Sequence, residues 1–158
     1  MCLIESGNPI FIQVRVGKNQ RPFKLIKFRT MKMNTPSVAS HLITKKSVTK
    51  FGGIIRSLKL DELPQLFNVI SGEMGLVGPR PCLYNQLKLI ELRKKYNLFD
   101  VKPGITGLSQ IRGIDMSDPE VLSQTDFQMT STMKHEDYFK YLFLTLVGQG
   151  VGDKVKKN

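Results

Sequence analysis

The sequence predicts an α+β fold: a compact, helix-rich single domain with a small β-hairpin. Two patterns favour this class. Apolar and polar residues alternate near the N-terminus, and apolar residues recur at helical spacing through much of the remainder. With 158 residues the chain is long enough for one domain with a sizeable core, and its hydrophobic content of 41% is ordinary for a globular protein. We therefore expect residues 1–158 to form one domain.

The hairpin is expected from Pro9–Val16 and Phe23–Arg29. Both segments are rich in β-branched or aromatic residues, and the polar residues and glycine of Gly17–Gln20 between them are a turn signal. Basic residues alternate with apolar ones on the second strand, among them Lys27 and Arg29. Such residues can form a positive edge over a phosphate site or simply a solvated basic face.

The segment that follows the hairpin, Met33–Lys50, is polar and favours a loop. It can be a lid over a nucleotide or a plain surface loop. Gly52 and Gly53 then interrupt the chain, and Ile54–Lys59 is expected to form a short helix. Arg56 in that helix can reach a phosphate or an acidic neighbour.

A second helix is expected to begin near Asp61, because Pro64 is tolerated only in a first turn. Neighbouring helical residues point about 100° apart, so the carboxylates of Asp61 and Glu62 suit two separate tasks. Apolar residues form one stripe of this helix and polar residues another. A plain helix start is the alternative explanation, since acidic residues are common there.

Spaced glycines and Pro79-Arg80-Pro81 follow this helix, and a helix start does not explain them. Glycines let the backbone approach a ligand closely. The two prolines restrict the backbone of Arg80, whose guanidinium is well suited to grip phosphate oxygens. The acid pair, the helix and the braced arginine together predict a device for handling phosphates.

The net charge of +11 indicates an anionic partner: nucleic acid, an acidic membrane surface or a phosphorylated substrate. Nucleic acid is disfavoured, because the basic residues are not interleaved with stacking aromatics. The two cysteines and two histidines are too scattered for a disulfide framework or a zinc site. Tyr141–Val147 is the densest apolar run near the C-terminus, and it is too short to cross a bilayer.

Three further helices are expected in the C-terminal part of the chain. Cys82–Tyr96 is expected to be an amphipathic helix, and Ser117-Asp118-Pro119 begins another that runs to about Thr132. Tyr138–Val147 is apolar on nearly all sides, so it is either buried or one of a set of interfacial amphipathic helices. Lysines of the tail Gly150–Asn158 can add attraction to anionic lipid: Lys154, Lys156 and Lys157.

Lys102–Gly113 contains Pro103-Gly104 and Gly107 and is expected to be a tight loop. A structural turn is one explanation. The other is a nucleotide-binding loop, in which polar side chains contact the base or ribose: Thr106, Gln110 and Arg112.

Ser57–Pro81, SLKLDELPQLFNVISGEMGLVGPRP, closely resembles the signature of the bacterial sugar transferases, which are monotopic phosphoglycosyl transferases. Gly17–Met31 resembles the basic strand segment of that family, and Val101–Gly113 resembles its later loop. One departure concerns this loop, which often continues Gly-Arg-Asn in the family, whereas Gly113 is followed here by Ile114. Met1–Gly7 resembles the tail of the family's N-terminal membrane helix, so the helix itself is expected to be absent from this chain.

The resemblance implies transfer of a sugar-1-phosphate from a UDP-sugar to polyprenyl (undecaprenyl) phosphate, with release of UMP, as the initiating step of surface glycan biosynthesis. It implies that Asp61 carries the phosphosugar covalently and that Glu62 binds Mg²⁺. Arg80 would stabilise the transferred phosphoryl group. The other expected phosphate-binding residues are basic: Lys27, Arg29 and Arg56.

Asp126 lies where the family has a functional acid, so it joins the candidate nucleotide-binding residues Thr106, Gln110 and Arg112. The resemblance also implies peripheral attachment to an anionic surface, the cytoplasmic face of a bacterial inner membrane. A non-catalytic phosphate- or membrane-surface-binding relative is the alternative, motivated by the missing segment and by Ile114.

Overall fold

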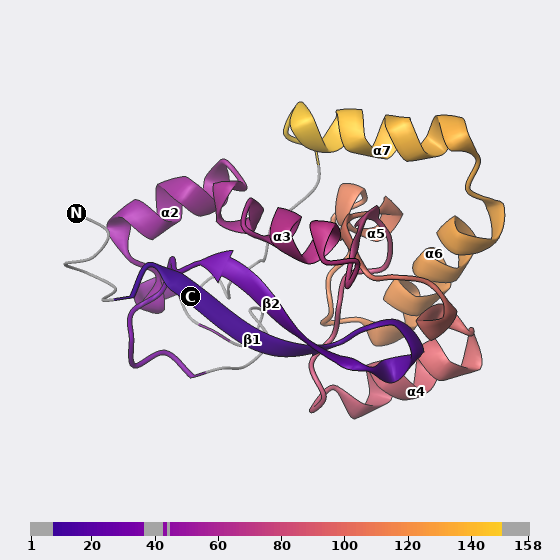
Figure 1. Ribbon diagram of the computed structural model, residues 1–158, viewed down its shortest axis with the longest axis horizontal. Helices are drawn as coiled ribbons and strands as arrows, with labels where there is room; N and C mark the ends of the chain where they lie inside the picture. The colour runs from indigo at the N-terminus through magenta and orange to yellow at the C-terminus, as the bar shows by residue number, and fades with distance from the viewer. Residues whose placement is uncertain (1–7, 37–42, 44, 150–158) are drawn as a thin grey trace.

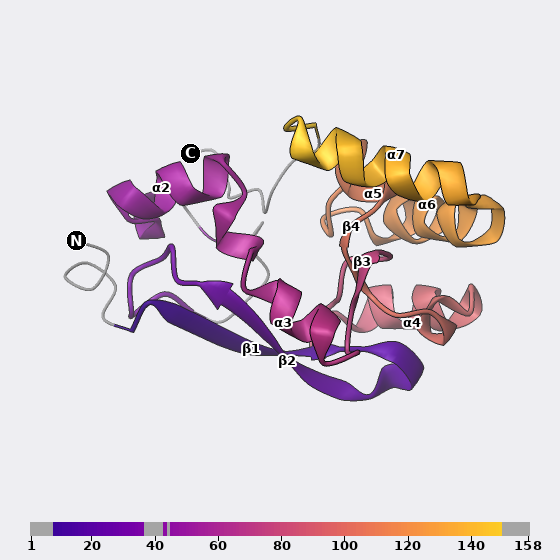
Figure 2. The ribbon, with the colours of Figure 1, turned by 45° about the horizontal axis from the view of Figure 1, so that its top comes forward.

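The computed structural model describes residues 8–36, 43 and 45–149, and it confirms the α+β class (Figure 1). The lysines expected to attract lipid in the tail, and part of the expected loop Met33–Lys50, lie outside the described residues. Figure 2 shows α2 (Lys50–Ser57) and α7 (His135–Leu146) on one side of the molecule, with the hairpin and α4 (Leu87–Lys95) on the opposite side.

The expected hairpin forms from β1 (Ile10–Val16) and β2 (Pro22–Phe28), which pair antiparallel from Ile10↔Phe28 to Val16↔Pro22. A 3-10 turn, η1 (Lys18–Gln20), joins them. The strands are half-buried, as their alternation predicts. Phe23 and Leu25 of β2 pack into the core, whereas alternate positions on the outer face of the hairpin are exposed.

A parallel pair of short strands, β3 (Gly75–Val77) and β4 (Gly104–Thr106), joins the two glycine-containing segments. The sequence predicted a tight loop for Lys102–Gly113 and no strand in either segment, because three-residue strands carry too few residues to show a period. Their backbones touch almost directly: a Cβ added to Gly104 would lie 2.1 Å from the amide nitrogen of Gly78. Only glycine fits so close an approach.

The helix expected from Asp61 is in fact two pieces, the 3-10 turn η4 (Leu60–Glu62) and α3 (Gln65–Ile70). Its apolar stripe faces outward rather than into the core: Phe67 is 67% exposed and Ile70 is 82% exposed. The polar stripe is the buried one, with Gln65 and Asn68 almost fully enclosed. A pattern of two stripes identifies an amphipathic helix but does not say which stripe meets the core.

The C-terminal half of the domain is helical. α4 begins five residues later than the expected Cys82, because the side chain of Gln86 accepts a hydrogen bond from the backbone of Leu83 and holds a turn there. α6 (Pro119–Thr132) begins at the expected place with Asp118 as its cap. The remaining short elements are α5 (Leu108–Ile111), η5 (Leu98–Asp100) and η3 (Lys45–Ser47).

The close backbone contact yields a stability prediction. Gly104→Ala should lower the free energy of unfolding by about 2 kcal/mol or more, since the new methyl group clashes with backbone that cannot move aside. Gly53→Ala is the matched control, because a Cβ at this position of α2 meets nothing within 4 Å. It should be neutral or stabilise by up to about 1 kcal/mol. Urea denaturation measures both, and equal effects would contradict the contact.

Candidate active site

Asp61 lies in η4, is 5% exposed, and lines a cavity of about 60 Å³. Three of the expected phosphate-binding residues line the same cavity: Lys27, Arg29 and Arg56. They come from β2, the end of β2 and α2, so segments far apart in sequence meet here. The cavity is therefore a small, partly open space that one carboxylate and several cations line.

The carboxylate of Glu62 contacts Arg80 and Lys27. Arg80 donates from Nη2 to Glu62 Oε1 at 2.5 Å, and Lys27 Nζ lies 3.5 Å from the same oxygen. All three side chains are largely buried. Asp61 and Glu62 thus diverge as helical neighbours are expected to: Asp61 faces the cavity, and Glu62 connects Lys27 to Arg80.

The turn between α2 and η4 places the acid pair. Lys59 adopts a left-handed conformation with φ 56°, which ends α2 and redirects the chain into η4. Its ammonium donates to the carbonyl of Gln149 at 2.6 Å. Burial lowers the pKa of Lys59; Glu62 opposes this shift and Arg80 adds to it. Lys59 therefore lies within the electrostatic field of the Glu62–Arg80 pair.

Asn68 fixes α3, which follows the acid pair, against β2, which carries Lys27. Its Oδ1 accepts from the amide of Ile26 at 3.1 Å, and its Nδ2 donates to the carbonyl of Lys24 at 2.8 Å. The side chain thereby bonds the edge of β2 as a neighbouring strand would. Nδ2 also contacts Glu73 Oε2 at 2.7 Å. This buried amide explains why a polar stripe faces the interior.

Two cavity cations also hold the structure together. Arg29 donates to the carbonyls of Asn8 and Ile10, and its guanidinium lies 5.4 Å from the centre of the Phe11 ring. Arg56 Nη1 lies 3.4 Å from Thr30 Oγ1. These contacts fix the arginines in place, which lowers the entropy lost when they bind a ligand.

The sequence analysis did not predict three buried polar residues that line the cavity: Gln13, Arg15 and Thr30. Gln13 and Arg15 occupy alternate, inward-facing positions of β1 and are buried. A polar residue on the inner face of a half-buried strand is unusual, so the alternation of β1 held a signal for them. Arg15 also donates to the carbonyl of Pro81 at 3.1 Å, which ties β1 to the segment that carries Arg80.

The four candidate nucleotide-binding residues lie apart from this cavity, around α5 and α6. Thr106 Oγ1 is 2.6 Å from Thr145 Oγ1, and Gln110 Nε2 donates to the carbonyl of Ile105 at 2.6 Å. Arg112 is exposed and contacts Gln128. Asp126 is 1% exposed. Their role in nucleotide binding stays a prediction.

The charge of Asp126 is enclosed by protein. Its carboxylate accepts from Arg93 Nη2 at 2.9 Å and from Ser109 Oγ at 2.6 Å. Burial raises the pKa of Asp126, and the guanidinium of Arg93 and the hydroxyl of Ser109 oppose that rise. Both oxygens therefore have partners inside the protein, which suits a residue that fixes neighbouring segments.

A magnesium ion at the acid pair would need oxygens from a bound substrate. In residues 8–36, 43 and 45–149 there is no group of three or more His, Cys, Asp or Glu side chains that could hold a metal alone. Mg²⁺ commonly binds through one or two carboxylates together with substrate phosphates. Of the two acids, Glu62 is the one expected to hold Mg²⁺. Its carboxylate also contacts Arg80 and Lys27, so a bound diphosphate would have to supply the other oxygens.

Comparison with known proteins identifies the family. The family model for bacterial sugar transferases matches residues 1–149. The chain belongs to the bacterial sugar transferase family. The match covers the hairpin, the acid pair and the described helices that follow them to α7, so the cavity at Asp61 lies within the family's domain.

Several relatives of this sugar transferase domain are similar in sequence. It is 47% identical over 111 residues to the sugar transferase EpsL of Bacillus subtilis, covering 70% of this chain and 54% of the relative. It is 40% identical over 119 residues to a UDP-glucose:undecaprenyl-phosphate glucose-1-phosphate transferase of Caulobacter vibrioides, covering 70% and 43%. A UDP-N-acetylgalactosamine-undecaprenyl-phosphate N-acetylgalactosaminephosphotransferase of Aeromonas hydrophila is 36% identical over 132 residues, covering 78% and 31%.

The domain thus spans about half or less of the length of these relatives. Across its described residues, no helix combines the length and the hydropathy needed to cross a bilayer.

The buried charges around Glu62 yield a second prediction. Glu62→Gln should lower the free energy of unfolding by about 2–4 kcal/mol, because it leaves the buried cations Lys27 and Arg80 without their shared carboxylate. Glu120→Gln removes an exposed ion pair with Lys88 and should change stability by less than about 1 kcal/mol. Urea denaturation at neutral pH measures both. Equal effects would contradict the buried pairs.

Proposed function

We propose that this sugar transferase moves a sugar-1-phosphate from a UDP-sugar to undecaprenyl phosphate, releases UMP, and so begins the assembly of a surface glycan. The observation that carries the proposal is Asp61, a buried carboxylate in a cavity lined by Lys27, Arg29 and Arg56. The printed names of relatives from Caulobacter vibrioides and Aeromonas hydrophila describe this class of reaction.

Asp61 is the proposed nucleophile. One carboxylate oxygen attacks the sugar-linked phosphorus of the UDP-sugar, the P–O bond to UMP breaks, and UMP leaves with that electron pair. An aspartyl-phosphosugar remains. An oxygen of the lipid phosphate then attacks the same phosphorus, which restores the carboxylate and yields the lipid diphosphate sugar. An ionised carboxylate carries no proton that a general base would have to remove in the first step.

Both substrates are anions, so the site must offset their repulsion. Lys27, Arg29 and Arg56 supply positive charge around Asp61, where it can stabilise the charge on the transferred phosphoryl group. Arg80 contributes beside Glu62. Glu62 would hold Mg²⁺, which when bound supplies further positive charge against the phosphates.

The relatives do not agree on the sugar. Their names specify glucose in Caulobacter vibrioides and N-acetylgalactosamine in Aeromonas hydrophila. The proposal therefore specifies a UDP-linked sugar and no particular one.

We further propose that the side formed by α2 and α7 rests on an anionic membrane surface. Figure 2 shows these two helices on the same side. Large apolar residues are exposed on α7 and on or just after α2: Ile54, Leu58, Phe139, Phe143 and Leu146. Apolar patches of this kind mark interaction sites, and a cytoplasmic membrane surface attracts a chain of net charge +11.

The first test of the proposal is release of UMP. Wild-type protein, given UDP-sugars, undecaprenyl phosphate and Mg²⁺, should release UMP, and Asp61→Asn should release it roughly a thousandfold more slowly or worse. Glu120→Gln, an exposed charge change outside the site, should match the wild type. If the folded wild type releases no UMP with any UDP-sugar, the chain is instead a non-catalytic phosphate- or membrane-surface-binding relative.

The second test is flotation with lipid vesicles. The double variant Phe139→Ser/Phe143→Ser should bind vesicles of an anionic phospholipid at least about tenfold more weakly, because two exposed aromatic side chains are removed from the proposed contact. The matched control is Ile12→Ser/Val14→Ser, which removes exposed apolar side chains from the hairpin on the opposite side. Equal weakening by both variants would contradict the assignment of this face.

A further inference from the structure

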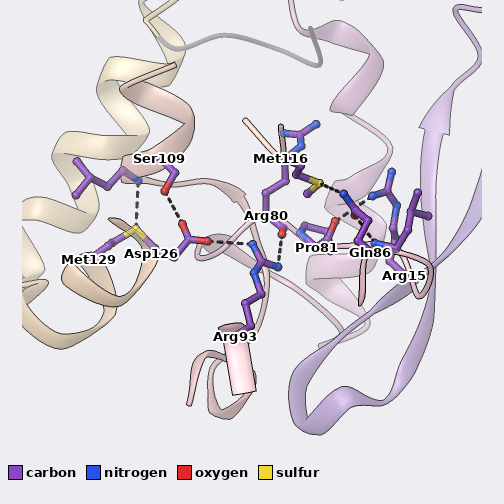
Figure 3. A network of polar contacts seen from close by, with 11 residues as sticks. Arg15, Arg80, Pro81, Gln86, Arg93, Ser109, Met116, Asp126 and Met129 are labelled. Carbon is purple, nitrogen blue, oxygen red and sulfur yellow. Dashed lines mark hydrogen bonds and ion pairs between the residues drawn. The ribbon is translucent and has the colours of Figure 1, made fainter. Parts of the chain in front are cut away.

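A buried polar network contacts the main chain of the segment that carries Arg80 (Figure 3). Arg93 of α4 donates from Nη1 to the carbonyl of Arg80 at 2.7 Å and from Nη2 to Asp126 Oδ2 at 2.9 Å. Ser109 holds the other carboxylate oxygen of Asp126 at 2.6 Å. Figure 3 shows the guanidinium of Arg93 between Arg80 and Asp126. One side chain therefore links Arg80 to α6 and, through Asp126, to α5.

Neighbouring bonds restrain the same segment at either side of Arg80. The carbonyl of Pro79 accepts from the amide of Gly104 at 3.0 Å, and the carbonyl of Pro81 accepts from Arg15 Nη1 at 3.1 Å. Three consecutive carbonyls thus have fixed donors. Of these donors, only the Arg93 guanidinium acts on Arg80 itself, and Arg93 is 2% exposed.

We infer that Arg93 is a positioning residue for the transfer reaction: it fixes the main chain of Arg80 so that the Arg80 guanidinium meets Glu62 and the transferred phosphoryl group in one geometry. The inference rests on the proposed function, and it goes further by giving Arg93 and Asp126 a task away from the substrate. Asp126 holds Arg93 in place by bonding Nη2 while Nη1 points to the Arg80 carbonyl.

Burial makes the charge of Arg93 costly unless it is paired. A guanidinium enclosed to this degree needs a counter-charge, and Asp126 supplies it with both members of the pair inaccessible to solvent. The planar guanidinium presents two parallel donors at a fixed spacing, which a lysine ammonium cannot do. Arg93→Lys therefore keeps the charge but is expected to lose one of the two bonds.

The anchoring step can be measured without any activity. In Arg93→Lys, the amide of Gly104, which bonds the carbonyl of Pro79, should exchange its hydrogen about tenfold faster than in the wild type. Leu89→Ala is the matched control, because Leu89 is a buried residue of the same helix and packs in an apolar cluster. Leu89→Ala should be destabilised to a similar extent as Arg93→Lys. The exchange rate of the Gly104 amide should nevertheless rise less in Leu89→Ala. Equal exchange in the two variants would overturn the anchoring.

The kinetic consequence is a lowered kcat. Below its unfolding temperature, Arg93→Lys should lower kcat for UMP release by about tenfold to a hundredfold, as expected for a slightly misplaced catalytic group, with KM changed by less than about threefold. Leu89→Ala should retain kcat within about twofold. A purely structural role would lower the amount of folded protein in both variants and leave the kcat of the folded fraction unchanged, which would overturn the inference.

A double-mutant cycle separates action through Arg80 from an independent effect. If Arg93 acts through Arg80, adding Arg93→Lys to Arg80→Ala should lower kcat no further than Arg80→Ala alone. Multiplied losses would overturn the inference. Absence of UMP release from the wild type contradicts the proposed function, whereas unchanged exchange at Gly104 contradicts the anchoring, so the two failures are distinguishable.

Discussion

The contact of Glu62 with Lys27 and Arg80 is the constraint on which the site depends. It joins the hairpin, the acid pair and the proline-braced arginine, three segments that are distant in the chain. Buried charges of this kind are stable only when all the partners are present. Lys27 also lines the cavity that Asp61 faces, so the contact and the cavity share this lysine. Asp61 and Glu62 therefore have different surroundings, because their side chains point in different directions.

Further buried polar contacts fix the segments that carry Glu62, Lys27 and Arg80. Asn68 bonds α3 to the edge of β2, and Gly78 and Gly104 bring two loops into direct backbone contact. Arg93 and Arg15 donate hydrogen bonds to the carbonyls of Arg80 and Pro81, respectively. The interior of the domain is therefore unusually polar near the site, while its apolar residues gather in small clusters and on the exposed sides of α2, α3 and α7.

Sequence reasoning predicted the elements that have a clear period or a clear cap, such as the hairpin and the start of α6 at Asp118. It also singled out Asp61 and Glu62, because their spacing before Pro64 and Arg80 was informative. It did not predict the pairing of β3 with β4, which depends on tertiary contact between short segments. Nor did it predict that Asp126 is enclosed by Arg93 and Ser109, since a polar residue on a helix carries no mark of its burial.

The most direct test of Asp61 as the covalent carrier is intact-protein mass spectrometry of the wild type, quenched after mixing with a UDP-sugar and Mg²⁺ but without a lipid acceptor. The protein should gain the mass of one phosphosugar, peptide mapping should locate it on Asp61, and addition of undecaprenyl phosphate should remove it. UMP release and turnover without any such adduct, or an adduct on another residue, would contradict the mechanism.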